Sequence, residues 1–258
     1  MGSMNELIYL SKPASVHMED EWFEIATADH FWMQRRFEVL CRLGRQMDFP
    51  SRKTAEIGCG RGVLQQQLEN EFGIEVAGFD LNEKALRSSV AQNHPRYYYN
   101  IFDRDPQFAA AYDTLVLFDV LEHIEQEQPF LEAVLYHLRP GGYLLINVPA
   151  LMSLYSRYDK VLGHQRRYTL KTLDAACLKA GLKRAEATYW GMPFIPVLLL
   201  RKFLLTWQND PKKIAQRGYK PPGRWGNRLL SLLGKLDPLP QTITGTSLMV
   251  FYRKVGGP

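Results

Sequence analysis

The stretch KTAEIGCGRGVLQQQLENEF, residues 53–72, joins a short apolar strand, a glycine-rich turn and an amphipathic helix. Thr54 and Ile57 are β-branched, as is usual in a covered strand. The helix is expected to begin near Val63, because apolar residues then recur on one stripe. A strand, a turn and a helix in this order direct free backbone N–H groups into the crevice beyond the strand. The stretch therefore predicts a ligand-binding α/β unit.

The turn carries three alternating glycines and an acid in the spacing E-x-G-x-G-x-G, formed by Glu56, Gly58, Gly60 and Gly62. Glycine tolerates positive φ and, because it lacks Cβ, lets a ligand touch the backbone. The next strand ends in Asp80, where an acid can accept both hydroxyls of a ribose. A nicotinamide-binding turn normally reads G-x-G-x-x-G. The early third glycine therefore favours another ribose-containing cofactor, with a ligand-free glycine turn as the alternative.

Strands alternate with helices or loops from residue 53 to residue 149, which predicts a doubly wound α/β fold with a mostly parallel sheet. Strands are expected at 54–57, 74–80, 97–102, within 112–124, and at 143–149, 183–190 and 244–254. Helices are expected from Val63 to Phe72 and at 83–92, 128–139 and 169–180. Asn82 and Thr169 are suitable N-caps for two of them.

Residues 16–47 are predicted to be mostly helical, and residues 30–43 read HFWMQRRFEVLCRL. One interpretation is a helix packed on the sheet edge with its arginines in solvent. The other is a cap over the cofactor. In that case the Trp32 ring stabilises a nearby cation, and Arg36 pairs with a carboxylate.

A loop rich in tyrosine and arginine, residues 151–169, follows the fifth expected strand, at the edge where substrates gather. His164 is the candidate proton acceptor, because imidazole titrates near neutrality. A loop histidine that holds the backbone is the alternative. Tyr155 and Tyr168 either line the acceptor pocket or pack against it.

Two arginines follow that histidine in the same loop. Arg166 and Arg167 can bind an anionic substrate, although Arg166 can instead pair with Asp159. The string DVLEH, residues 119–123, offers Glu122 and His123 as further titratable groups. One acid and one histidine make a poor metal site, so no metal is expected, and the pair is interpreted as a brace for the loop below the cofactor.

The motifs HFW, EIGCGRG, FDVLEH, LRPGG, VPA and GHQRRYT follow one another in this chain. With them, residues 16–190 resemble a bacterial group within the class I S-adenosylmethionine (SAM)-dependent methyltransferases, related to the type 11/12 methyltransferase domains. The resemblance implies a Rossmann-like, seven-stranded sheet with an antiparallel last strand, SAM as cofactor, and methyl transfer. One departure is Leu151, where similar chains often have histidine.

The resemblance also implies roles for residues at the crevice. The three glycines would lie against SAM, Asp80 would bind its ribose, and Asp103 its adenine; a turn aspartate that caps the next loop is the alternative for Asp103. Apart from the resemblance, Asp119 is expected nearer the methionine end because it follows the fourth strand, and the cap interpretation puts Trp32 near the sulfonium and Arg36 at the carboxylate. The residues expected to contact SAM are Glu56, Gly58, Cys59, Gly60, Gly62, Asp80, Leu81, Asp103, Asp119, Trp32 and Arg36.

Four parts are expected: an N-terminal helical cap at 1–50, the SAM-binding core at 51–190, an insertion at 191–243 and the last strand within 244–258. The insertion opens with an apolar run that prolines and basic residues interrupt, so it is not predicted to span a membrane. Residues 201–228 then hold eight Lys or Arg and one acid, a balance of 8 − 1 = +7. The insertion is interpreted as a lid or as a contact with an anionic membrane surface.

The three cysteines, Cys41, Cys59 and Cys177, show no paired spacing, which favours reduced thiols and a cytoplasmic protein, with a peripheral position at the inner membrane surface also open. The expected function is O- or N-methylation of a small-molecule or lipid-linked acceptor. Nucleic acid is not expected, because the motif for base amines is absent after the fourth strand. A non-catalytic SAM-binding or membrane-associated scaffold and an NAD(P)-dependent oxidoreductase are the alternatives.

Overall fold

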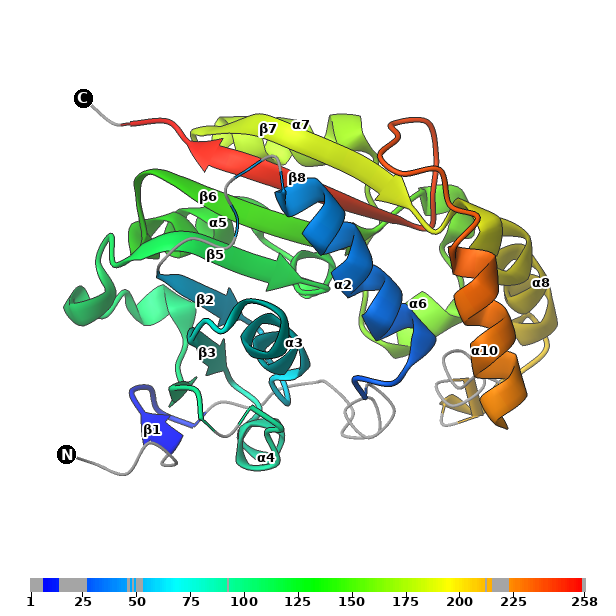
Figure 1. The fold of residues 1–258 in the computed structure, drawn as a ribbon, viewed down its shortest axis with the longest axis horizontal. Helices are drawn as coiled ribbons and strands as arrows, with labels where there is room; N and C mark the ends of the chain where they lie inside the picture. Colours follow the sequence, from blue (N-terminus) through cyan, green and yellow to red (C-terminus); the bar gives the residue numbers. More distant parts are fainter. Residues whose placement is uncertain are drawn as a thin grey trace.

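An eight-stranded sheet in the order β1-β4-β3-β2-β5-β6-β8-β7 forms the centre of the protein (Figure 1). The computed structural model describes residues 7–13, 27–45, 47, 49, 53–91, 93–211, 213–214 and 223–256. Residues 16–26, part of the stretch predicted to be mostly helical, lie outside the described residues, as do Lys212, Arg217 and Lys220. The strands are β1 Leu7–Tyr9, β2 Thr54–Ile57, β3 Val76–Asp80, β4 Arg96–Tyr98, β5 Tyr112–Phe118, β6 Leu138–Pro149, β7 Leu182–Trp190 and β8 Ser247–Lys254.

The mostly parallel sheet with an antiparallel last strand is confirmed, since β8 runs antiparallel to both β6 and β7. The predicted number of seven strands is wrong. Leu7–Tyr9 adds an eighth strand, which pairs in parallel with β4 through Leu7 and Arg96. Three residues are too short to show a strand period, so the sequence did not reveal this pairing.

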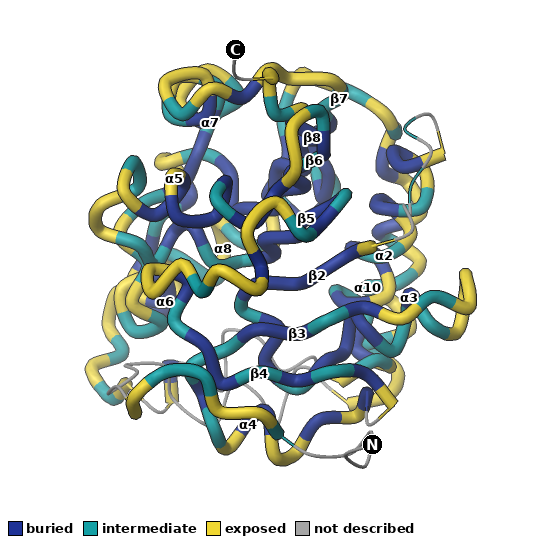
Figure 2. Tube along the Cα trace, turned by 90° about the vertical axis from the view of Figure 1, so that its left-hand side faces the viewer, coloured by how far each residue is buried: buried dark blue, intermediate teal, exposed yellow. Residues whose placement is uncertain are grey.

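Helices cover both faces of the sheet (Figure 1). They are α2 Phe31–Gly44, α3 Val63–Phe72, α4 Glu83–Arg87, α5 Glu127–His137, α6 Arg157–Val161, α7 Leu170–Lys179, α8 Ile195–Leu205 and α10 Gly223–Gly234. The side chains of successive residues in β5 point to opposite faces of the sheet. Val116 and Phe118 pack in the cluster that holds α2 and α3, whereas Leu115 and Leu117 pack with α5 and α7. Figure 2 shows that β2 and β3, which lie within the sheet, are largely buried.

Two predicted elements are shorter in the structure than the sequence suggested. The helix expected at 83–92 ends at Arg87. The strand expected at 97–102 ends at Tyr98, and Ile101–Asp103 form a 3₁₀ turn. The Asn100 side chain accepts from the Phe102 N–H at 3.2 Å and so caps that turn. A local side-chain bond of this kind competes with strand pairing.

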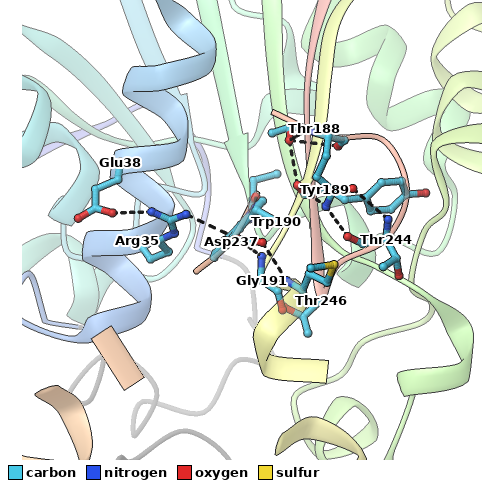
Figure 3. Close-up of polar contacts among 12 residues, drawn as sticks. Arg35, Glu38, Thr188, Tyr189, Trp190, Gly191, Asp237, Thr244 and Thr246 are labelled. Atoms are coloured by element: carbon cyan, nitrogen blue, oxygen red, sulfur yellow. Dashed lines mark hydrogen bonds and ion pairs between the residues drawn. The ribbon is translucent and has the colours of Figure 1, made fainter. Parts of the chain in front are cut away.

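The insertion contributes α8 and α10, which lie at the end of the sheet to which the parallel strands point (Figure 1). No helix among the described residues is long and apolar enough to cross a membrane. Asp237, just after α10, has a fully buried side chain that accepts from the N–H groups of Gly191 and Met192 and lies 3.8 Å from the Arg35 guanidinium. Figure 3 shows how this carboxylate connects the insertion to α2 and to the end of β7.

Candidate functional site

The glycine turn after β2 has the backbone that its sequence predicts. Gly58, Gly60 and Gly62 have φ values of 75°, 52° and 72°, in the left-handed region that favours glycine. A Cβ on Gly58 would stand 2.4 Å from a methyl group of Val120. Gly62 is the N-cap of α3 and, having no side chain, makes no cap bond to the N–H groups of the first helical turn, which are groups that a ligand can use.

Asp80 holds this turn from the end of the neighbouring strand. Its carboxylate accepts from the Gly60 N–H at 2.6 Å and from the Asn82 N–H at 2.8 Å. Burial raises the pKa of Asp80, while the bonds from Asn82, Gly60 and Leu81 oppose that rise. A carboxylate offers about four lone-pair positions, so it can accept further donors. Asp80 lies at the end of β3, the position expected for a ribose-binding acid, and this role stays a prediction.

Glu56 is a buried acid beside the glycine turn. Its exposed fraction is 3%, and its Oε2 atom has no hydrogen-bond partner among the described residues. Burial raises the pKa of Glu56 to about 8, and the charge of Arg36 opposes the rise. Buried polar atoms in proteins normally have a partner, so this oxygen marks a place where a donor is missing.

A chain of polar contacts lies at the ends of β5 and β6. The Arg36 guanidinium donates to Asp119 Oδ2 at 2.6 Å, and Asn147 Nδ2 donates to Asp119 Oδ1 at 2.7 Å. Trp190 Nε1 donates to Asn147 Oδ1 at 2.9 Å. Asp119 has a φ of 57°, an uncommon conformation for a residue with a side chain, often found at functional sites. Arg36 is buried and its Nε has no partner among the described residues, so the interpretation with arginines in solvent is wrong here.

Trp32 packs on this chain of contacts, with its ring centroid 4.4 Å from that of Trp190. Cys59 is buried in a small cluster against which Leu81 packs. Asp103 is exposed and accepts from Ser11 Oγ at 2.5 Å, while Ser11 accepts from the Asn100 N–H. No sequence pattern indicated Ser11, because the contact spans 92 positions of the chain.

His164 lies in the loop after α6, held by a buried acid. Its Nδ1 is 3.2 Å from Asp159 Oδ1, and its carbonyl accepts from the Tyr155 hydroxyl at 2.6 Å. Arg167 Nε also donates to Asp159 Oδ1, at 2.7 Å, and Ser156 donates to Oδ2. Burial of Asp159 opposes ionisation, but the bonds from His164 and Arg167 hold the pKa of its carboxyl well below the usual range.

The other side chains predicted to contact the acceptor, Arg166, Arg167 and Tyr168, bond to other residues of the protein. Arg166 pairs with Glu127 at 3.1 Å, so the suggested pair with Asp159 is wrong. The Arg167 side chain is buried against Asp159 and the Ala150 carbonyl. The buried Tyr168 hydroxyl donates to Glu127 and contacts the Leu121 carbonyl. Contacts of these three side chains with an acceptor stay predictions.

Glu122 and His123 lie on the 3₁₀ turn Leu121–His123, and the fold brings His164 to them. The two imidazole rings are perpendicular, with centroids 4.7 Å apart. Burial raises the pKa of Glu122 well above its usual range and, with the nearby His164, lowers the pKa of His123 to about 3. The sequence argued against a metal site because only one acid and one histidine stand together in it. In the structure His164 lies beside Glu122 and His123, so that argument no longer applies.

Comparison with known proteins relates the chain to methyl-transferring enzymes. A family model described as a methyltransferase domain matches residues 17–187. The ubiquinone biosynthesis O-methyltransferase of Pectobacterium carotovorum is 27% identical over 199 residues, which cover 67% of this chain and 78% of that protein. The enzyme of the same name from Cronobacter sakazakii is 27% identical over 104 residues, covering 37% and 42%.

A SAM-dependent methyltransferase from Archaeoglobus fulgidus has a similar fold, with a TM-score of 0.55 and 19% identity, covering 87% of this chain and 96% of that one. The chain spans about half the length of the first curated relatives it matches.

Proposed function

The chain belongs to the class I SAM-dependent methyltransferases, and from that premise we propose that it moves a methyl group from SAM to an oxygen or nitrogen atom of a small-molecule or lipid-linked acceptor. The relatives named as ubiquinone biosynthesis O-methyltransferases support an oxygen acceptor on a lipid-linked ring. The SAM-binding role of residues 51–190 is part of this proposal.

The observation that carries the proposal is a buried carboxyl group and a buried guanidinium, each with one atom that lacks a hydrogen-bond partner among the described residues. Glu56 Oε2 and Arg36 Nε both lie buried without a partner among the described residues. The methionine end of SAM carries an ammonium and a carboxylate, which complement these two groups. The backbone of the glycine turn and the Asp80 carboxylate at the end of β3 would hold the remainder of the cofactor.

Bound SAM supplies an already activated methyl group. The chain must align the acceptor for in-line displacement and, for a hydroxyl, remove its proton. We assign the removal of that proton to His164, because the Asp159 carboxylate at Nδ1 orients the ring. Tyr155 holds the backbone of the same residue. For an amine, alignment by the loop 151–169 suffices.

We also propose that α8 and α10 meet an anionic membrane surface, where a lipid-linked acceptor would be found. Large apolar side chains on or just after these helices are exposed: Val197, Leu199, Leu200, Phe203, Leu204, Trp207, Trp225, Leu229, Leu232 and Leu236. Arg224, Arg228 and Lys235 are exposed beside them. An apolar face flanked by basic residues is the pattern of helices that lie in a membrane interface.

The test is calorimetric titration of the whole chain with SAM and with NADH, followed by a screen for transfer of labelled methyl into cell extract and lipid-linked phenols. We expect SAM to bind, NADH to fail, and an oxygen- or nitrogen-methylated product to form. Folded protein that does not bind SAM rejects the proposal. SAM binding with no methylated product across the screen favours the scaffold alternative.

A further inference from the structure

A buried carboxylate and two imidazoles meet beyond the carboxyl end of β5, and we propose that Glu122, His123 and His164 bind one divalent transition-metal ion. Two of these residues come from the turn after β5 and the third from the loop after α6, 41 positions later. One possible donor atom from each residue lies within 4.8 Å of the donor atoms of the other two.

The second, independent observation is the state of the Glu122 carboxylate. The residue is 1% exposed, and neither carboxylate oxygen has a hydrogen-bond partner among the described residues. A buried acceptor without a partner gives up its hydrogen bonds to water and gains none in return, and this loss is larger when the group is charged. Most such groups in proteins have a partner or face an ion. A cation between the three side chains would supply the partner that Glu122 lacks.

The ring of His164 is already oriented as in a metal site. Its Nδ1 faces Asp159 Oδ1 at 3.2 Å, which leaves the other ring nitrogen for an ion. Histidines that bind metals commonly give their second nitrogen to a carboxylate, which orients the ring and strengthens the ligand. Asp159 is itself held by Arg167 and Ser156, so this outer support does not depend on the ion.

The donor set indicates the class of ion. Two imidazole nitrogens and one carboxylate oxygen suit Zn²⁺ and its neighbours Co²⁺ and Ni²⁺, whereas Mg²⁺ and Ca²⁺ prefer oxygen donors. In a tetrahedral zinc site, ligand atoms about 2.0–2.1 Å from the metal stand about 3.3 Å from one another. The side chains must therefore close by up to about 1.5 Å on binding, with the fourth position open.

The proposed ion would use the imidazole that the proposed base would also use, so one molecule cannot do both at once. The metal inference does not rest on the proposed methyl transfer. Binding is therefore measured without SAM and without acceptor, and its outcome is separate from that of the activity test.

The experiment is titration of the whole, reduced chain with Zn²⁺ by calorimetry and with Co²⁺ by visible absorption. We expect one ion per chain and a Co²⁺ spectrum of tetrahedral type without thiolate charge-transfer bands, since no cysteine is a ligand. Glu122→Gln should weaken binding of either ion at least about tenfold. Glu125→Gln makes the same chemical change on an exposed side chain three residues away and should leave it unchanged.

Thermal unfolding accompanies each variant, because Glu122 is buried. If Glu122→Gln does not fold, His164→Asn replaces it, since that side chain is partly exposed. The inference fails if the wild-type chain binds neither ion. It also fails if a folded Glu122 or His164 variant binds Zn²⁺ as tightly as the Glu125 variant, or if the cobalt spectrum reports thiolate ligands.

Discussion

The Arg36 guanidinium donates to the Asp119 carboxylate across 2.6 Å and so connects α2 to the end of β5. The preceding residue, Arg35, lies 3.8 Å from Asp237, which in turn accepts from the backbone before α8 (Figure 3). Two adjacent arginines thus join one helix to the predicted cofactor crevice and to the insertion. We expect that changes in the insertion will be felt at the crevice through α2.

Arg36→Ala should weaken SAM binding about 10- to 100-fold, because hydrogen bonds to charged groups contribute about 1.5–3 kcal/mol. Calorimetry measures the affinity. Arg42→Ala removes an exposed arginine from the same helix and is the matched control. Equal SAM affinity in folded Arg36→Ala and Arg42→Ala would contradict the assignment of Arg36 to the cofactor.

Asp80→Asn should weaken SAM binding by about 1–3 kcal/mol, since the amide loses the charge and one acceptor needed for a ribose. Asparagine is preferable to alanine here because Asp80 also accepts from two N–H groups of the turn. Asp113→Asn makes the same change at the opposite end of the sheet, near the start of β5. The ribose assignment is lost if the Asp80 variant keeps wild-type affinity.

Glu56→Gln should alter how stability depends on pH. The pKa of Glu56 is raised from 4.5 to about 8 by burial, so the folded state binds this proton more tightly than the unfolded state does. Its contribution to stability is complete below the unfolded pKa and is lost as the pH rises toward the folded pKa. A difference of one between the two pKa values corresponds to about 1.36 kcal/mol of unfolding free energy. Between about pH 5 and pH 8, the unliganded wild type should lose more stability than the variant.

Thermal unfolding of the two proteins at several pH values measures that difference, and the contributions of other titrating groups cancel in it. The exposed Glu71→Gln on α3 is the control. Glu56→Gln should also weaken SAM binding, because an amide cannot pair with an ammonium as a carboxylate does. Parallel stability curves for Glu56→Gln and wild type would show that the acid is ionised without cost in the fold.

His164→Ala should lower turnover about 10²- to 10⁴-fold on a hydroxyl acceptor and leave SAM affinity nearly constant. His94→Ala removes a buried histidine that bonds Glu69 and the backbone of β3 and controls for general loss of structure. Loss of SAM binding together with turnover would identify His164 as structural.

Leu229→Glu should abolish flotation with anionic liposomes, because it places a charge within the exposed apolar face of α10, where Leu229 is 67% exposed. Leu178→Glu alters a leucine of similar exposure on α7 and should float as the wild type does. Binding should weaken as salt increases, since basic residues contribute about 1 kcal/mol each near such a surface. If the wild type does not float with anionic liposomes in a salt-sensitive way, the membrane interpretation is rejected and the lid interpretation of the insertion is the one that stands.

The antiparallel last strand was implied by the family resemblance. The repeated local patterns of the chain were enough to predict the parallel sheet and the glycine turn with Asp80 at the next strand's end. Each of these features depends on residues close together in the chain: apolar runs for strands, apolar residues at helical spacing, and glycines where φ is positive. The cap residues Asn82 and Thr169 were also predicted correctly, since a cap acts within one turn.

Contacts between distant segments were decided only by the tertiary structure. The pairing of Leu7–Tyr9 with β4, the bond between Ser11 and Asp103, and the ion pair of Arg36 with Asp119 join residues more than eighty positions apart. Only the tertiary structure showed that His164 lies beside Glu122 and His123, because the sequence placed it in an acceptor loop alone. Such contacts depend on the path of each loop and on the packing of buried side chains, and no sequence period records either one.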